Sequence, residues 1–390
     1  MLKLAVLSIS FVLLSAMAIN GILPEIRDAL AITQTQSELL VTIPSIATLI
    51  FVILSDRFIS KIGMKKTVLL GLMLSGIGGI MPLFNSNSYS YILISRFIFG
   101  AGKGLIFTPS VGYINILFKE NERATLIGFR SAVEMLGQAI LTLTIGALAI
   151  FSWHLSFITN IIFFIIAGLV AWKIPEVETN SNLNSANNLS QDNAKIPLII
   201  FPLAVFVGIV AISGSMIAVR FPAMAAEIRG DGYNSSIWVA IKPLLGIIAA
   251  VFFGKLNAIL GKRLLFIGVA LLITAQMMIG FSNGNFAILV IGFQLSAFVL
   301  GWVVPIIINT ISRITTGKQQ RLSTALVLIC ANVGIFFMPF IVRGLEIIAG
   351  STELTAPYPL MGILITTILI TILLTSNNKT FRVKVGLENA

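Results

Sequence analysis

Two cations stand inside a long apolar run and share one face of the helix that this run predicts. Arg96 and Lys103 are seven residues apart, a spacing that returns to the same side of an α-helix. A cation at the centre of a bilayer costs about 2.5–3.5 kcal/mol on insertion scales, so neither is expected to face lipid. We expect each either to contact an anionic or polar substrate in an aqueous cavity, or to hydrogen-bond between packed helices.

Glu134 is the one acid that we place inside an apolar span. Arg130 and Gln138 stand four residues before and after it, so all three share a helical face. One interpretation makes Glu134 a proton carrier or substrate contact, with Gln138 beside it. The other makes Arg130 and Glu134 an ion pair near an inner gate.

The second half of the chain offers a weaker set of candidates. Lys242 is expected to face the cavity opposite Arg96 and Lys103, or to extend its ammonium group to the membrane surface. Three further polar or aromatic side chains at membrane depth either contact substrate or pack helices together: Gln294, Trp302 and Asn332.

A short basic segment, 54–66, lies between two apolar runs and is interpreted as a cytoplasmic loop. Asp56 ends the preceding helix and is expected to pair with Arg123 or Arg130. The alternative is a basic loop without a gating role. The predicted inner gate comprises Asp56, Arg57, Gly63, Lys65, Lys66, Arg123 and Arg130.

Composition requires a membrane around these residues. The 390 residues are 57% hydrophobic and 11% charged, and the mean hydropathy is +1.01. Soluble domains carry about a quarter charged residues, so this chain cannot cover itself against water. Each span needs about 20 apolar residues. Apart from a first span before Pro24 and a sixth ending near Lys173, we predict spans at 39–54, 67–84, 91–117, 124–150, 198–221, 237–254, 264–282, 286–312, 322–345 and 357–376.

The sequence repeats itself once. A shift of 198 positions lays Gly63 on Gly261 and, without a gap, Arg123 on Arg321. The stretch between the copies is rich in Asn and Ser and has no periodicity, which is typical of a linker. We predict an all-α membrane protein of twelve transmembrane helices in two six-helix repeats: an N-terminal half at 1–175, a cytoplasmic linker at 176–197 and a C-terminal half with a short tail at 198–390.

The net charge of +11 is a topology signal and predicts no nucleic-acid partner. Of the 26 Lys and Arg residues, nineteen fall in the predicted loops of one side or in the tails. The other side, which includes a polar outer loop at 24–38, holds Arg27, Arg220, Arg229 and Arg343. This bias predicts a multi-pass plasma-membrane protein with both termini in the cytoplasm.

Two motifs resemble signatures of the major facilitator superfamily. Asp56-Arg57 followed by Gly63-Met64-Lys65-Lys66 is similar to the loop between helices 2 and 3 of that family. The spacing of Arg96 and the glycines at 100, 102 and 104 resembles its helix 4 signature. Leu23-Pro24-Glu25-Ile26-Arg27 and the short loops resemble the cyanate and 2-nitroimidazole transporter branch. The resemblance implies a substrate site near mid-membrane between two halves that rock against each other.

The predicted function is secondary active transport of a small polar or anionic solute by alternating access. The alternative is a proton-coupled exporter of drugs or metabolites with the same fold, although Leu141-Thr142 stands where the drug antiporters have Gly-Pro. An enzyme is not expected, because the chain has one His and one Cys. The same counts exclude a Cys- or His-based metal site within the chain. We expect a monomer without a cofactor, whose partners are its solute, the lipid bilayer and a coupling proton.

Overall fold

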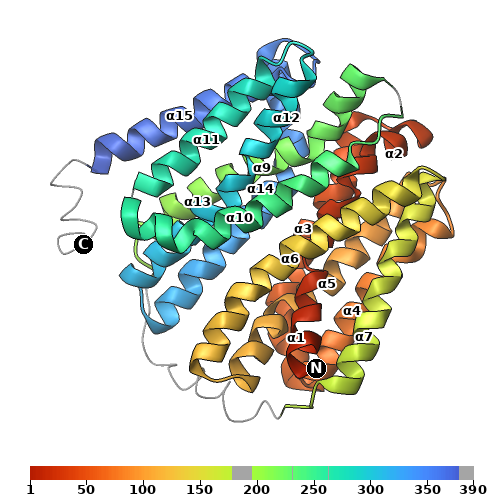
Figure 1. The fold of residues 1–390 in the computed structure, drawn as a ribbon, viewed down its shortest axis with the longest axis vertical. Helices are drawn as coiled ribbons and strands as arrows, with labels where there is room; N and C mark the ends of the chain where they lie inside the picture. The colour runs from red at the N-terminus through yellow and green to blue at the C-terminus, as the bar shows by residue number, and fades with distance from the viewer. Residues whose placement is uncertain (178–195, 231, 262, 377–390) are drawn as a thin grey trace. The chain divides into compact units, whose positions relative to one another are not determined.

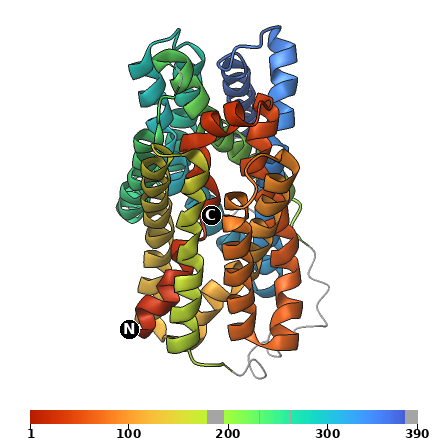
Figure 2. The ribbon, with the colours of Figure 1, turned by 90° about the vertical axis from the view of Figure 1, so that its right-hand side faces the viewer.

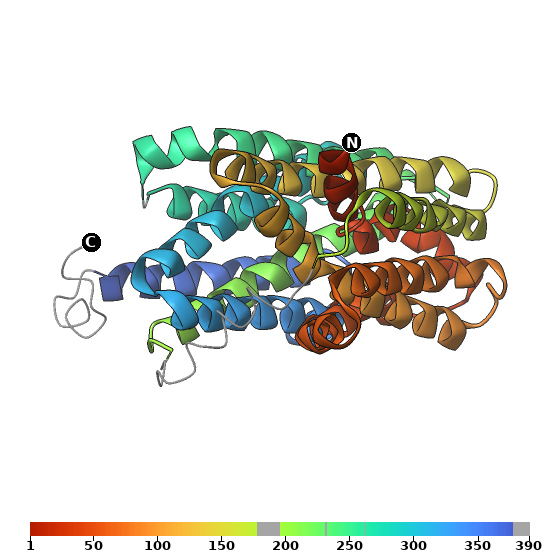
Figure 3. The same cartoon turned by 90° about the horizontal axis from the view of Figure 1, so that it is seen from below.

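The protein is helical wherever its structure is described. The computed structural model describes residues 1–177, 196–230, 232–261 and 263–376. Within these ranges the chain forms helices and connections without a β-strand (Figure 1, Figure 2 and Figure 3). The first helices are α1 (Leu2–Phe11), η1 (Ser15–Ile22), α2 (Leu23–Ala29), α3 (Gln34–Ile62), α4 (Met64–Ile80), η2 (Met81–Leu83), α5 (Tyr89–Leu117), α6 (Glu120–Ala149), η3 (Trp153–Ile161) and α7 (Ile162–Lys173).

After the predicted linker the helices continue as α9 (Ile200–Arg229), α10 (Ser236–Leu260), α11 (Arg263–Gly280), α12 (Phe286–Leu295), α13 (Ala297–Ile314), α14 (Gly317–Ala349) and α15 (Pro357–Ser376). Among the described residues, ten helical segments are long and apolar enough to cross a membrane, and the bent pair α1 with η1–α2 makes an eleventh. A shorter apolar helix lies within α15. Every predicted span therefore coincides with a helix.

Two compact units are formed by the contacts within the chain. The first is Met1–Gln191 with Ala225–Ile247, and the second is Asp192–Met224 with Ile248–Ala390. The segment 225–247 belongs to the second repeat by sequence but to the first unit by contact. The predicted linker lies mostly outside the described residues, and the division of the chain at 176–197 stays a prediction.

The first unit is built around α5. This helix packs along both α3 and α4, while α7 covers α4, and α1 contacts α6 and α7. Its apolar core includes Phe99 of α5 and Phe163 of α7, whose rings meet edge to face with centroids 5.4 Å apart. The polar site residues of α5 and α6 are therefore held by a close-packed helical frame.

The second unit is centred on α11, which packs against α12, α13 and α15. Gln276 of α11 also donates a hydrogen bond to the side chain of Ser213 in α9. Phe221 of α9 stacks on Phe293 of α12 with ring centroids 4.0 Å apart. Such side-chain contacts hold helices together where lipid provides no hydrophobic driving force.

The basic segment 54–66 is helical rather than a loop. The helix α3 continues to Ile62 and α4 starts at Met64, so Gly63 alone makes the turn. Gly63 has φ = 87°, a conformation that glycine adopts without the steric strain of a side chain. The polar residues that suggested a loop extend α3 beyond its apolar span.

The predicted outer loop 24–38 is also largely helical. It contains α2 and the first turn of α3, where Thr33 and Gln36 form a reciprocal capping box. Glu38 lies in α3 and is fully buried. Glu134 is consequently not the only acid in a helix core, because Glu346 of α14 is buried as well. A capping box satisfies the free backbone donors of a helix start, so α3 can begin within a polar stretch.

Candidate functional site

Three glycines let α5 approach its two neighbours closely. A Cβ atom added to Gly100 would lie 2.6 Å from Pro44 Cα, and one on Gly104 would lie 2.6 Å from Thr48 O, both in α3. A Cβ on Gly102 would lie 2.5 Å from Ser75 N in α4. Real Cβ atoms do not come this close to backbone. The glycine motif of the sequence is therefore a packing device that fixes α5 between α3 and α4.

Arg96, the first of the two cations on α5, donates hydrogen bonds to two backbone carbonyls. Its side chain is 1% exposed, and its guanidinium donates to Leu40 O at 3.1 Å and to Ala16 O at 2.9 Å. Pro44 stands four residues after Leu40 and has no N–H, so the Leu40 carbonyl lacks its normal helical donor. In a membrane such a group needs another partner. The contacts of Arg96 correspond to the helix-packing alternative.

The second carbonyl bound by Arg96 lies next to a break in the first membrane span. The helix α1 ends at Phe11, and the segment Ser15–Ala29, which begins with the 3-10 helix η1, is bent by 47° relative to α1. Gly137 of α6 faces this break, because a Cβ atom there would overlap the carbonyl oxygen of Phe11. Arg96 and Gly137 thus hold the non-α-helical start of η1 inside protein, where its backbone is sheltered from lipid.

Lys103 lies seven residues after Arg96, on the same face of α5, and it is not hydrogen-bonded to a backbone carbonyl of the described residues. It is 9% exposed, and among the described residues it forms no hydrogen bond or ion pair, unlike Arg96. The charges that act on its ammonium group are those of Arg96 and Glu134. A buried lysine without a direct counter-ion is costly at membrane depth. Of the two cations on α5, Lys103 is therefore the one without a direct partner among the described residues.

Arg130 and Glu134 form the ion pair that their spacing suggested. Arg130 Nη2 lies 2.9 Å from Glu134 Oε1, and both side chains are largely buried. The Arg130 guanidinium also lies over the Phe107 ring, 5.4 Å from its centroid, and its Nε is 3.4 Å from Ser110 Oγ. Phe107 and Ser110 belong to α5, so the pair ties α6 to the same helix that carries Lys103. Gln138 is half-buried one turn further along α6.

The candidates of the second repeat are distributed over both units. Lys242 is buried and belongs to the segment of α10 that joins the first unit. In the second unit, Trp302 Nε1 donates to Ala249 O at 3.0 Å and Asn332 Nδ2 donates to Leu328 O at 2.9 Å. Gln294 has a buried carbonyl oxygen. Trp302 and Asn332 therefore bond to backbone in this structure.

The repeat gives two of these residues a counterpart in the first unit. A shift of 198 positions lays Arg96 on Gln294 and Glu134 on Asn332. Arg96 and Glu134 of the first repeat thus each have a neutral amide at the matching place in the second repeat.

The predicted inner gate is not paired in this structure. Asp56 and Arg123 are exposed, and Asp56 forms no ion pair with Arg123 or Arg130. Arg130 is instead paired with Glu134. Arg57 and Lys66 are exposed, while Lys65 Nζ donates to the Ala171 carbonyl at the end of α7 at 2.9 Å. A cation at a helix C-terminus stabilises its free carbonyls.

Comparison with known proteins identifies the family. The sequence profile described as Major Facilitator Superfamily matches residues 5–207, which is more than half of the chain. This chain belongs to the major facilitator superfamily. It is therefore an all-α, multi-pass membrane protein, as the repeat and the two motifs predicted. The cyanate-like branch stays a prediction.

Two curated relatives of this facilitator come from Bacillus subtilis (strain 168). The hexuronate transporter is 28% identical over 181 residues, which cover 45% of this chain and 42% of that protein. The bacillibactin exporter is 28% identical over 111 residues, covering 27% of this chain and 28% of that protein. The matches span less than half the length of these relatives. The solved structure of the nucleoside transporter NupG superposes with a TM-score of 0.78 at 10% identity over 96% of this chain and 99% of that one, which shows the fold.

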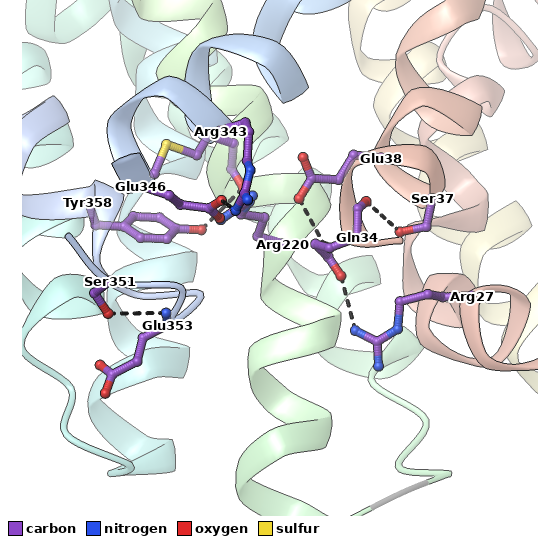
Figure 4. A network of polar contacts seen from close by, with 11 residues as sticks. Arg27, Gln34, Ser37, Glu38, Arg220, Arg343, Glu346, Ser351, Glu353 and Tyr358 are labelled. Atoms are coloured by element: carbon purple, nitrogen blue, oxygen red, sulfur yellow. Dashed lines mark hydrogen bonds and ion pairs between the residues drawn. The ribbon is translucent and has the colours of Figure 1, made fainter. Parts of the chain in front are cut away.

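Sequence reasoning missed a cluster of ion pairs in the second unit. The sequence predicts Arg220 at the outer end of the span 198–221, yet its side chain is 1% exposed. Its Nη1 lies 2.7 Å from Glu346 Oε1, and Arg343 Nη1 lies 2.9 Å from Glu346 Oε2 (Figure 4). The available signal was an isolated arginine within the long apolar run that became α9. Such a charge at membrane depth needs a partner, here a glutamate of α14.

A polar chain in the first unit was missed as well. Arg27 Nη1 donates to Gln34 Oε1 at 3.0 Å, and Gln34 Nε2 donates to the buried Glu38 Oε1 at 2.9 Å (Figure 4). This relay connects α2 to the first turn of α3. Sequence analysis did not predict these hydrogen bonds, because all three residues fall in the predicted outer loop 24–38.

Proposed function

We propose that this facilitator is a secondary active transporter that moves a small anionic solute across the plasma membrane by alternating access. The family membership supports transport by rocking of one half on the other. The observation that carries the choice of an anion is the buried ammonium group of Lys103, which has no direct counter-ion among the described residues.

The balance of charges near Lys103 supports this assignment. The guanidinium of Arg96 is hydrogen-bonded to two backbone carbonyls. The positive charge of Arg130 is paired with the negative charge of Glu134. Lys103 therefore contributes one uncompensated positive charge to the α5–α6 region. A carboxylate or a similar oxyanion would supply both the negative charge and a hydrogen-bond acceptor, which makes a charge-assisted contact.

The name of one relative agrees with this chemistry. A hexuronate is a sugar acid, so the relative named hexuronate transporter handles a small polar solute with a carboxylate. We infer the same substrate class for this chain. Glu134 remains our candidate for the coupling proton, because it is a largely buried acid whose charge acts on Lys103. We further propose that the transporter works as a monomer with both termini in the cytoplasm.

A binding screen on the purified protein tests the proposal. Carboxylates, neutral sugars, amines and known export substrates are added separately, and stabilisation against heating is measured. A ligand at 100 times its Kd stabilises the native state by about 2.7 kcal/mol. Stabilisation by carboxylates and by no neutral analogue supports the proposal. Stabilisation by hydrophobic drugs alone, with lower cellular accumulation of those drugs, would establish the exporter instead.

A matched pair of variants tests whether the anion contacts Lys103. Lys103→Gln removes a charge-assisted contact worth about 1.5–3 kcal/mol, so binding should weaken by roughly ten- to a hundredfold. The loss should shrink at high salt, where screening already weakens the contact of the parent protein. Lys61→Gln makes the same charge change at an exposed position of α3 and should leave affinity unchanged. Equal affinities of Lys103→Gln and the parent would refute the assignment.

A further inference from the structure

A three-residue segment of the second repeat is embedded in the first unit. Asn234, Ser235 and Ser236 lie at the start of α10, within the segment 225–247 that clusters with the first unit. Ser235 is fully buried and Ser236 is 4% exposed. Short polar residues at the end of a membrane helix usually contact water, so their burial requires a specific packing site in the surrounding helices. We call the site that encloses Ser236 the seat.

Two glycines of the first repeat form that seat. A Cβ atom on Gly21 of η1 would lie 2.9 Å from Ser236 Cα. A Cβ atom on Gly146 of α6 would overlap Ser236 Cβ. The Ser236 side chain is therefore enclosed between two helices at positions where no other residue type fits without movement.

Polar contacts close the seat from both sides. Asn234 Nδ2 donates to Gly146 O at 2.7 Å, and Ser235 Oγ donates to Gly21 O at 3.4 Å. Asn234 Oδ1 also accepts from the backbone N–H of Ser236 at 3.0 Å, which satisfies a free donor in the first turn of α10. These bonds engage backbone carbonyls of the first repeat and can be released without leaving a buried charge.

We propose that this seat is the outer gate of the transporter: Ser236 between Gly21 and Gly146, latched by Asn234. Its contacts join the start of α10 to η1 and α6, which belong to different sequence repeats. When the repeats rock against each other, this seat must open once in each cycle. The assignment to the outer side rests on the proposed function and on the predicted topology, in which the spans 198–221 and 237–254 are connected outside the cell.

Labelling of a single cysteine tests the gate without any solute. Ser235→Cys is introduced together with Cys330→Ala, which removes the only native cysteine. Intact cells are then treated with a membrane-impermeant maleimide, and the labelling rate is measured. Because Ser235 is fully buried when the seat is closed, the rate reports how often the seat opens to the outside. No labelling over many turnover times would overturn the proposal.

Gly146→Ala in this background should hold the seat open. The added methyl group collides with Ser236 Cβ, so labelling should become faster by on the order of tenfold and uptake should fall. Gly128→Ala is the matched control in the same helix, since nothing lies within 4 Å of a Cβ there. Unchanged labelling in Gly146→Ala, or equal acceleration in Gly128→Ala, would show that the seat is ordinary packing.

A second variant keeps the test decisive if Gly146→Ala does not fold. Asn234→Ala removes the latch to Gly146 O and adds no bulk, so it should also accelerate labelling, by a smaller factor. An unchanged rate in Asn234→Ala would overturn the proposal as well. The gate and the transport function fail separately: labelling that responds to these variants while no solute binds supports the gate and refutes the anion assignment.

Discussion

The contact between Arg96 and the carbonyl freed by Pro44 makes a quantitative prediction. Arg96→Met removes the guanidinium from Leu40 O and Ala16 O. In Pro44→Ala, the new N–H at position 44 can bond Leu40 O within α3. The loss of stability caused by Arg96→Met should therefore be smaller in the Pro44→Ala background than in the parent protein.

The expected loss of stability in Arg96→Met is the difference between two opposing free-energy contributions. A hydrogen bond to a charged group contributes about 1.5–3 kcal/mol, and Arg96 makes two to carbonyls. Removing a cation from membrane depth returns about 2.5–3.5 kcal/mol. The middle of these ranges leaves a net loss of about 1.5 kcal/mol for Arg96→Met. Since Pro44→Ala replaces one of the two donors, the coupling energy should reach about 1 kcal/mol.

Unfolding of the purified protein by a denaturing detergent measures this double-mutant cycle. The four proteins are the parent, Arg96→Met, Pro44→Ala and the double variant. Pro109→Ala, in α5, is the control partner and should add to Arg96→Met within about 0.5 kcal/mol. Additive losses for Arg96→Met and Pro44→Ala would refute the reasoning. Full stability of Arg96→Lys would do so too, because a lysine lacks the planar fork that reaches two carbonyls.

Three further outcomes are expected. Gly102→Ala should lower the stability and uptake of the transporter, because its Cβ would lie 2.5 Å from a backbone nitrogen of α4; Gly128→Ala should change neither, and equal effects in thermal unfolding would contradict this. Asp56→Asn should slow transport more than it weakens binding if Asp56 pairs with a cation only in another state of the cycle; equal losses would argue against a gate. Reporter fusions at Asn188 and Ala390 should both report the cytoplasm, and a split result would rule out the topology.

Long apolar runs and the repeat were sufficient for the architecture. A bilayer offers no water to backbone groups, so most of them bond within their own helix and hydropathy alone locates the spans. The positions of all twelve predicted spans hold helices for this reason. Helix ends were less predictable: polar residues at 54–62 and 34–38 read as loops, because a helix that passes the membrane surface carries polar side chains without losing its backbone bonds.

Sequence spacing also identified the charged residues of the site, but it could not divide their roles. Arg96 and Lys103 lie on the same face of one predicted helix and within the same apolar run. Only the fold places the carbonyl of Leu40, fifty-six residues earlier in the chain, beside Arg96 and leaves Lys103 without such a partner among the described residues. Spacing within one helix predicted the Arg130–Glu134 pair, because both partners lie on that helix. The pairing of Arg220 with Glu346 and the seat of Ser236 depend on contacts between distant segments, which tertiary packing alone decides.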